Sequence, residues 1–311
     1  MSGGILVIKL GALGDFVQAL GPMAAIRAHH KGERIVLLTT RPYLELAEAS
    51  EYVDEVWLDP RPRLFEIGKW RALRRSLKRG HFKRVYDLQT SDRSSFYFRL
   101  FMPEKPPEWS GIARGCALPH ANPDRDRMHT VERQQDQLRM AGVSTLGFEG
   151  PAKLDLGWAT ADVAGLRPAG RYWLLAPGGA QHRPEKRWPA EHYAVLARHL
   201  IETGATPVVI GGADETAVAA AIAAAAPGTL DFAGKTELLQ LAELAHGAEG
   251  AVGNDTGPMH LIAAVGCPSW VLYSHASDPA LCGQRGKRVT ILRQDDLATL
   301  APAAVTAALS D

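Results

Sequence analysis

Short apolar runs alternate with longer segments of helical periodicity along nearly the whole chain. This alternation is typical of parallel strands that are joined and covered by helices. In the first half, strands are predicted at 5–8, 34–39, 53–58 and 84–88, and helices near 15–29, 42–49, 64–79, 93–101 and 128–141. In the second half, strands are predicted at 172–176, 207–210, 250–252, 269–273 and 289–292, and helices near 189–203, 214–226, 236–246, 257–265 and 296–309.

Glycine and proline cluster at 147–157, which predicts a domain boundary in this chain of 311 residues. We therefore predict an α/β protein with two Rossmann-like, doubly wound domains, residues 1–152 and 153–311, that face each other across a cleft. The last helix is expected to pack back on the N-terminal domain. Ligands of such sheets bind beyond the carboxyl ends of the strands.

Charge and cysteine content exclude several classes of protein. The chain has 35 Lys and Arg against 34 Asp and Glu, a net charge of +1, which indicates no bulk attraction to nucleic acid. Cys116, Cys267 and Cys282 lie far apart without a CxxC pair, which fits neither a disulfide framework nor a zinc site and suits a reducing compartment. Lys9 and Asp15 interrupt the apolar start, so we expect no signal peptide, and no apolar stretch is long enough for a transmembrane helix. The expected location is the cytoplasm, at most peripheral to a membrane.

The charge is unevenly distributed. Residues 1–150 carry five more basic than acidic residues, whereas 151–311 carry four more acidic than basic ones. The basic excess is concentrated in 61–84, RPRLFEIGKWRALRRSLKRGHFKR, which holds ten Lys or Arg and one acid, Glu66. Such a segment is either a solvated amphipathic helix or a surface for an anionic partner.

The first predicted strand ends in KLGALGD, directly before a helix. Gly11 and Gly14 allow a tight turn and the close approach of a ligand, and Asp15 falls in the first helical turn. This carboxylate is either a helix N-cap or a general base at the ligand-binding edge. The GxxG spacing is not the GxGxxG of dinucleotide folds, and the GKT at 234–236 lacks the first glycine of a phosphate loop.

The stretch AVGNDTGPMH predicts a strand, a loop and a helix N-terminus. Asp255, Thr256 and Gly257 supply a cap, a hydroxyl and free backbone N–H groups at the positive end of a helix dipole, where a diphosphate is readily held. Pro258 suits the first turn because its missing N–H would have no partner there. His260 either points toward the same ligand or is structural.

Two further loops follow predicted strands. In APGGAQHRPEKRWP, the basic residues Arg183, Lys186 and Arg187 either neutralise phosphates or belong to a solvated loop that Trp188 anchors in the core. In IGGADE, Asp214 either accepts hydrogen bonds from ribose hydroxyls or caps a helix.

These elements, in this order and spacing, resemble the ADP-heptose:lipopolysaccharide heptosyltransferase family, glycosyltransferase family 9. The resemblance spans nearly the whole chain, through KLGALGD, PEKRWP, GGADE, FAGKTELLQLAEL and GNDTGPMHLIAAVGCPSWVLY. The last block is the most specific, because its D-[ST]-G-x-x-H signature follows a strand. The resemblance implies a GT-B fold, a sugar-nucleotide donor such as ADP-heptose held mainly by the C-terminal domain, and inverting transfer without a metal or other cofactor.

The resemblance also implies roles for individual residues. Asp15 resembles the general base that deprotonates the acceptor hydroxyl, and Lys186 resembles the cation on the donor phosphates. Asp214 lies where the family often has a Glu that contacts the ribose, and Thr236 lies beside the expected adenine pocket. The residues predicted to bind the donor are Lys186, Asp214, Thr236, Asp255, Thr256, Gly257, Pro258 and His260.

The implied acceptor is an anionic, phosphorylated, Kdo-bearing lipid A core at the inner face of the cytoplasmic membrane, bound by the N-terminal domain. The basic segment 61–84 fits such a partner, because each basic side chain near an acidic surface adds about 1 kcal/mol of attraction. The residues predicted to bind the acceptor are Gly11, Gly14, Arg61 and Arg63.

Two other classes of function remain open. Family members that act on the first inner-core sugar carry two hydroxyl residues before the PEKRW-like loop, where this chain has Gln181 and His182. A different enzyme of the same fold, either a transferase with another donor or a non-hydrolysing epimerase, would keep the diphosphate site and change the sugar pocket. A non-catalytic ADP-binding module would tolerate replacement of Asp15 by Asn.

Overall fold

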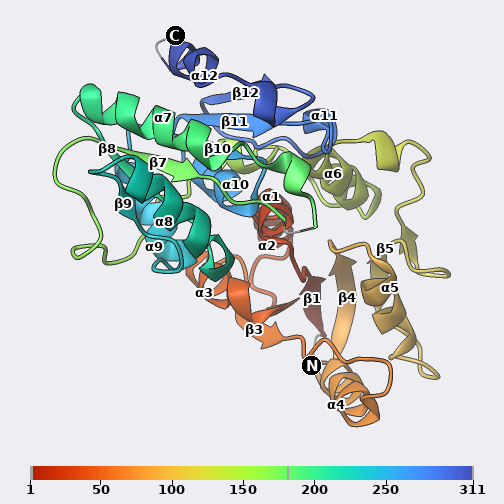
Figure 1. Cartoon of the computed structure of the whole chain (residues 1–311). Coiled ribbons are helices and arrows are strands. Elements are labelled where there is room, and N and C mark those ends of the chain that lie inside the picture. Colours follow the sequence, from red (N-terminus) through yellow and green to blue (C-terminus); the bar gives the residue numbers. More distant parts are fainter. Residues whose placement is uncertain (1–2, 181, 310–311) are drawn as a thin grey trace. The chain divides into compact units, whose positions relative to one another are not determined.

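The computed structural model describes residues 3–180 and 182–309 and divides into two compact units, Met1–Leu154 and Asp155–Asp311 (Figure 1). The division lies two residues beyond the boundary expected from the sequence. Each unit contains a six-stranded parallel sheet with helices packed on it. The predicted class, an α/β protein with two Rossmann-like domains, is confirmed.

The N-terminal sheet has the strand order β3-β2-β1-β4-β5-β6. Its strands are β1 (Gly4–Ile8), β2 (Ile35–Thr39), β3 (Glu55–Leu58), β4 (Phe82–Asp87), β5 (Glu108–Gly111) and β6 (Leu118–Pro119). Its helices are α1 (Leu13–Gln18), α2 (Leu20–His29), α3 (Leu44–Ala49), α4 (Ile67–Arg79), α5 (Asp92–Arg99) and α6 (Thr130–Met140). The order reverses between β1 and β4, so this is the switch point where doubly wound sheets bind ligands.

The core of the N-terminal unit explains why its central strands read as apolar runs. All five residues of β1 and of β2 are buried. Leu6 and Ile8 of β1 pack in one cluster with Leu73 and Leu77 of α4. Since side chains alternate along a strand, the intervening Val7 points to the opposite face, and both faces of β1 are therefore covered.

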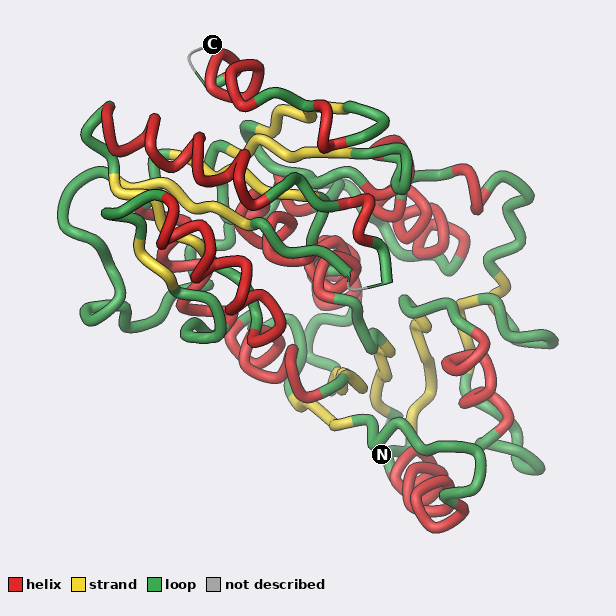
Figure 2. Tube along the Cα trace, in the orientation of Figure 1, coloured by secondary structure: helices red, strands yellow, loops and turns green. Residues whose placement is uncertain are grey.

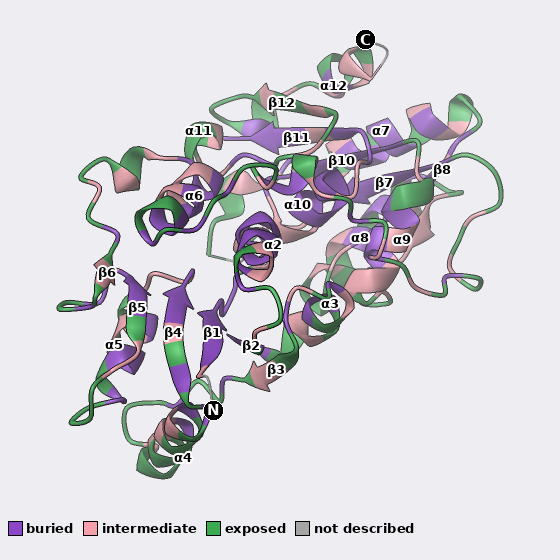
Figure 3. Ribbon diagram, turned by 180° about the vertical axis from the view of Figure 1, so that it is seen from behind, coloured by how far each residue is buried: buried purple, intermediate pink, exposed green. Residues whose placement is uncertain are grey.

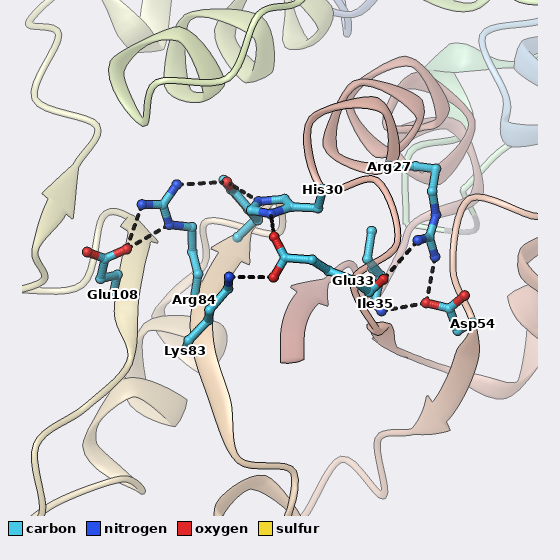
Figure 4. A network of polar contacts seen from close by, with 9 residues as sticks. Arg27, His30, Glu33, Ile35, Asp54, Lys83, Arg84 and Glu108 are labelled. Atoms are coloured by element: carbon cyan, nitrogen blue, oxygen red, sulfur yellow. Dashed lines mark hydrogen bonds and ion pairs between the residues drawn. The ribbon is translucent and has the colours of Figure 1, made fainter. Parts of the chain in front are cut away.

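A network of polar contacts joins α2, β2, β4 and β5 and the loop before β3 in the N-terminal unit (Figure 4). Arg27 of α2 donates to Asp54 at 2.7 Å. His30 contacts Glu33 at 2.9 Å, and Glu33 also pairs with Lys83 of β4. Burial lowers the pKa of His30, although the contact with Glu33 opposes that effect. This network lies at the amino ends of β2 and β4, away from the edge at which ligands are expected.

The C-terminal sheet has the strand order β12-β11-β10-β7-β8-β9. Figure 2 shows the strands in yellow and the helices in red. Its strands are β7 (Tyr172–Ala176), β8 (Thr206–Val209), β9 (Leu230–Asp231), β10 (Gly250–Asn254), β11 (Ser269–Tyr273) and β12 (Val289–Arg293). Its helices are α7 (Ala190–Glu202), α8 (Thr216–Ala225), α9 (Leu238–Gly247), α10 (Gly257–Ala264), α11 (Pro279–Cys282) and α12 (Pro302–Ala308). Here the order reverses between β7 and β10, which places a second switch point at their carboxyl ends.

The last helix, α12, packs on α7 of its own unit. The indole N–H of Trp270 in β11 donates to the carbonyl oxygen of Ala308 at 2.7 Å, and that of Trp188 donates to the carbonyl oxygen of Leu300 at 2.8 Å. Within the C-terminal unit, α12 is therefore held against α7, and the C-terminal segment supplies the acceptors that these two indoles need. That the last helix packs back on the N-terminal domain stays a prediction.

The central strands are buried, whereas the edge strands β3 and β12 are partly exposed (Figure 3). The strands β1, β2, β7 and β10 are buried along their whole length, whereas α4 buries only Leu73 and Leu77. Among the helices in 3–180 and 182–309, none is long and apolar enough to cross a membrane.

Candidate functional site

The KLGALGD loop is held at the switch point of the N-terminal sheet. Ile8, at the end of β1, pairs with Asp87 at the end of β4. The backbone N–H of Leu10 donates to the side-chain oxygen of Gln89 at 2.8 Å, and the buried Lys9 ammonium donates to the carbonyl oxygen of Leu88 at 3.2 Å. The loops that follow β1 and β4 are therefore joined at the edge where a ligand is expected.

Asp15 lies in the first turn of α1 and does not cap it. The N-cap position is Ala12, and no side chain makes a capping bond there. With the residues that the structure describes, the Asp15 carboxylate makes no hydrogen bond or ion pair. It lines a pocket of about 830 Å³, which is also lined by Gly11, Tyr43, Arg61 and others. An unpartnered carboxylate at a pocket wall is suited to accept a proton from a bound hydroxyl.

Two cations that the sequence analysis did not assign to the site lie near Asp15. Burial lowers the pKa of Lys9, while the nearby Asp15 carboxylate opposes that effect. Burial also lowers the pKa of Arg133 in α6, and Asp15 again acts in the opposite direction. Arg133 is far from Asp15 in the chain, so no local motif connects them.

The four residues predicted to bind the acceptor do not all line the Asp15 pocket. Gly11 has φ +119°, and a Cβ there would lie 2.8 Å from the Tyr43 ring, so only glycine fits. Gly14 is buried within α1 and does not form the turn. Arg61 lines the Asp15 pocket, whereas Arg63 is exposed and is not part of its wall.

In the C-terminal unit, the buried Asn254 side chain joins the loops at the second switch point. Its amide nitrogen donates to the carbonyl oxygens of Pro177 and Gly178, at 2.8 and 2.9 Å. Its oxygen accepts from the backbone N–H of Trp188 and from the hydroxyl of Tyr193, both at 3.0 Å. Asn254 at the end of β10 therefore fixes the loop after β7 and the start of α7.

We expect Asn254→Ala to lower the free energy of unfolding by on the order of 3 kcal/mol, because several buried polar groups lose their partners at once. Urea unfolding measures this loss. Asn122→Ala is the matched control: its amide is half-buried and donates to Asp136 at 2.7 Å, so a smaller loss is expected. Equal losses in the two variants would contradict the role given to Asn254.

Lys186 and Asp255 form a buried ion pair, with 2.5 Å between Nζ and Oδ2. The other carboxylate oxygen accepts from the hydroxyl of Tyr273 at 3.0 Å and from the amide of Gln284 at 3.1 Å. Burial is the largest single effect and favours a raised pKa for Asp255, but the hydrogen bond and the charge of Lys186, with smaller contributions from His260 and Ser277, together outweigh it, and the pKa lies below its ordinary value. The Nε2 of His260 lies 3.9 Å from the same carboxylate. The structure thus brings three of the predicted donor-binding residues together.

The N-terminus of α10 adjoins this pair and is open. Thr256 is the N-cap, Gly257 and Pro258 follow, and no side chain makes a capping bond. The hydroxyl oxygen of Thr256 is buried and has no hydrogen-bond partner in the described part of the chain. The sequence suggested Asp255 as a cap of this helix, but its carboxylate instead forms the ion pair with Lys186. Free N–H groups, the helix dipole and a cation form a site suited to an anion.

Asp214 and Thr236 lie on two loops at the same edge of the sheet. Glu215, rather than Asp214, accepts the backbone N–H of its turn, at 2.8 Å. Asp214 is exposed, and its carboxylate has no partner among residues 3–180 and 182–309. The backbone N–H of Gly234 donates to the carbonyl oxygen of Gly211 at 2.8 Å, which joins the Thr236 loop to the loop after β8.

The cations of the basic loop before α7 differ in how close they come to the anion site. Arg187 donates to the carbonyl oxygen of Gly179 at 2.6 Å and so braces the loop after β7. Arg183 and His182 are exposed. Gln181 lies outside the described residues. Of the three cations considered from the sequence, Lys186 is the one that reaches the N-terminus of α10.

The order of the loops and the anion site point to one family. The model of glycosyltransferase family 9 (heptosyltransferase) matches residues 70–303. The chain belongs to this family. The expectation drawn from the sequence motifs is therefore confirmed.

Individual relatives agree with the family assignment. A lipooligosaccharide heptosyltransferase 2 of Haemophilus influenzae is 38% identical over 120 residues, which cover 37% of this chain and only 34% of that protein. A family 9 glycosyltransferase structure from Veillonella parvula has a TM-score of 0.83 at 20% identity and covers 99% of this chain and 96% of the other. An E. coli heptosyltransferase solved with ADP-2-deoxy-2-fluoro heptose has a TM-score of 0.78 at 20% identity and covers 98% of each chain. The predicted GT-B fold of two Rossmann-like domains is confirmed.

Proposed function

We propose that this family 9 member transfers heptose from ADP-heptose to an inner-core lipopolysaccharide acceptor, with inversion at the anomeric carbon and without a metal. The observation that carries the proposal is the Lys186–Asp255 pair beside the open N-terminus of α10. A nucleoside diphosphate carries the negative charge that a cation and the free N–H groups of a helix N-terminus bind. The E. coli relative solved with an ADP-heptose analogue supports the choice of donor.

On the donor side, the leaving ADP gains negative charge as its bond to the sugar breaks. The Lys186 ammonium has three N–H donors, of which one is used by Asp255, so the others are available to phosphate oxygens. The backbone N–H groups at Gly257 and the Thr256 hydroxyl supply further donors. Asp255 thereby positions Lys186, and the assembly stabilises the departing diphosphate. Asp214 and Thr236, on the neighbouring loops, are assigned to the ribose and the adenine.

On the acceptor side, Asp15 is the general base. As the acceptor oxygen bonds to the anomeric carbon, its proton moves to the Asp15 carboxylate, and the bond between that carbon and the diphosphate oxygen breaks. ADP leaves with the electron pair. Attack on the face opposite the leaving group inverts the configuration.

The acceptor is proposed to be an anionic lipid A core, reached from the cytoplasm at the inner face of the cytoplasmic membrane. Arg61, in the wall of the Asp15 pocket, is assigned to an acidic group of this acceptor. Arg63, three residues before Glu66 on the exposed approach to α4, is assigned a weaker, long-range attraction.

A donor screen tests this function. The purified chain is incubated with a heptose-free core acceptor and with ADP-heptose, UDP-sugars or GDP-sugars, and the products are identified by mass spectrometry. We expect a heptose-sized mass increase with ADP-heptose alone. Transfer from another sugar nucleotide would reject the donor assignment, and ADP binding without any transfer would favour a non-catalytic module.

A further inference from the structure

Three large apolar side chains at the start of α4 are exposed to solvent. Leu64 is 86% exposed, Phe65 is 92% exposed and Ile67 is 60% exposed. Single exposed apolar residues are common, but a contiguous group marks an interaction site. These side chains follow one another closely in the chain and form an apolar tip on the N-terminal unit.

A row of unpaired cations continues from this tip along α4. Arg71, Arg75 and Arg79 recur every four residues, so they lie on one face of the helix. All three are exposed, and none makes a hydrogen bond or ion pair through its side chain within the described chain. Leu73 and Leu77 attach the opposite face of α4 to the core. The arginine face is therefore free for a partner.

The cations also surround a hollow in the surface. This hollow, of about 520 Å³, is lined by Arg71, Arg74, Arg75, Lys78, Arg79 and His81. Arg74 keeps its charge but is held by the carbonyl oxygen of Met102, to which it donates at 2.7 Å, whereas Lys78 is partly neutralised by Glu104 at 2.6 Å. The net charge of the hollow stays positive and attracts an anionic partner.

The apolar tip is continuous with the wall of the Asp15 pocket. Leu64 lines an apolar hollow of about 540 Å³ together with Trp70, Phe96 and Arg93. Arg93 lines the Asp15 pocket as well, and its guanidinium donates to the carbonyl oxygen of Pro62 at 3.2 Å. An acceptor whose lipid portion rested in the apolar hollow would therefore have its head next to this pocket.

We propose that Leu64, Phe65, Ile67, Arg71, Arg75 and Arg79 form a docking surface for an anionic phospholipid bilayer. The apolar tip inserts among the acyl chains, and the arginines pair with headgroup phosphates. Adjacent apolar and basic groups of this kind match the boundary between lipid tails and headgroups. Nucleic acid would match the arginines but not the aliphatic Leu64 and Ile67, which offer bases no ring to stack on.

Vesicle flotation with the full chain tests the docking surface. We expect flotation with vesicles of phosphatidylethanolamine and phosphatidylglycerol, little with phosphatidylcholine alone, and a decrease as salt is raised. The triple variant Leu64→Ser/Phe65→Ser/Ile67→Ser is expected to bind at least about tenfold more weakly, since the three apolar side chains that insert among the acyl chains are lost. The variant Arg71→Gln/Arg75→Gln/Arg79→Gln is expected to show a similar loss and a weaker salt dependence.

Matched controls exist for both variants. Leu146 is 83% exposed in the same unit, and Leu146→Ser is expected to bind as the wild type does. Lys287→Gln/Arg288→Gln/Arg293→Gln removes three exposed cations from the C-terminal unit and is likewise expected to bind normally. Losses in these controls equal to those in the docking variants would overturn the proposal.

The inference deepens the proposed function, because it places a lipid-linked acceptor at a bilayer, but its test does not use sugar transfer. The vesicles contain phospholipid only. Binding that appears only after the lipid A core is added would overturn a phospholipid surface. If the donor screen shows no heptose transfer while the vesicle results hold, the function fails and the docking surface stands.

Discussion

Asp15→Asn is expected to abolish transfer while ADP binding is retained. Asparagine keeps the shape of the side chain but cannot accept the proton of the acceptor hydroxyl, and a positioned base is worth on the order of 100-fold or more in rate. The carboxylate has no hydrogen-bond or ion-pair partner in the described residues, so the substitution removes no structural contact there. Product formation from ADP-heptose gives the rate, and calorimetry gives the affinity for ADP.

Glu45→Gln provides the matched control for this prediction. Glu45 is an exposed acid in the first turn of α3, in the same unit, and it is not part of the Asp15 pocket. Its replacement removes one negative charge and should leave the rate unchanged. If Asp15→Asn keeps more than about a tenth of the wild-type rate, a loss too small for a missing general base, another group takes the proton.

The strands that could be predicted from the sequence are those buried on both faces. The predicted bounds of β7 and β11 match the structure, because continuous apolar runs such as YWLLA are typical of central parallel strands. The strands β5, β6 and β9 were not predicted. They lie toward the sheet edges and are short, and in EWSG of β5 only Trp109 is large and apolar. Such segments have too little periodicity to distinguish them from loops.

The positions of the candidate site could be predicted better than its contacts. Loops after strands can be recognised locally, and the doubly wound order brings those after β7 and β10 to one switch point. The partners of Asp255 could not be predicted. Lys186 and Tyr273 are distant in the chain, and only the tertiary fold brings them to one carboxylate. For the same reason the capping role expected of Asp255 was wrong.

Lys186→Met is expected to weaken ADP binding at least about 100-fold, since a buried charge on the phosphates is lost, and to lower stability. The Lys186 side chain is 13% exposed and that of Asp255 is 7% exposed, so the variant leaves a nearly buried carboxylate without its cation. Breaking such a pair costs about 3–5 kcal/mol. Calorimetry measures the ADP affinity and urea unfolding measures the stability. Lys287→Met, at an exposed position, serves as the control and should change neither quantity.

The pH dependence of stability shows whether Lys186→Met is destabilised by loss of the ion pair with Asp255 or by a simple packing defect. In the wild type the pKa of Asp255 is below its ordinary value, so its stabilising effect is present above the unfolded-state pKa of about 3.9 and is lost as pH falls through the lower folded-state pKa. Without Lys186, burial remains as the largest effect and raises the pKa of Asp255. In Lys186→Met the effect of Asp255 on stability then reverses in sign. Its buried, unpaired carboxylate is fully destabilising at neutral pH, and this destabilisation disappears as pH falls through the raised pKa and the group is protonated. Urea unfolding between pH 5 and 8 should therefore show Lys186→Met approaching the wild type at acid pH.

The double variant Lys186→Met/Asp255→Asn distinguishes ligand binding from stability. A neutral amide removes the buried charge, so most of the lost stability should return. ADP binding should not return, because the amide restores no cation to the diphosphate. If instead both recover together, Lys186 acts only by holding the loop in place, and the diphosphate must be bound by the N-terminus of α10 alone.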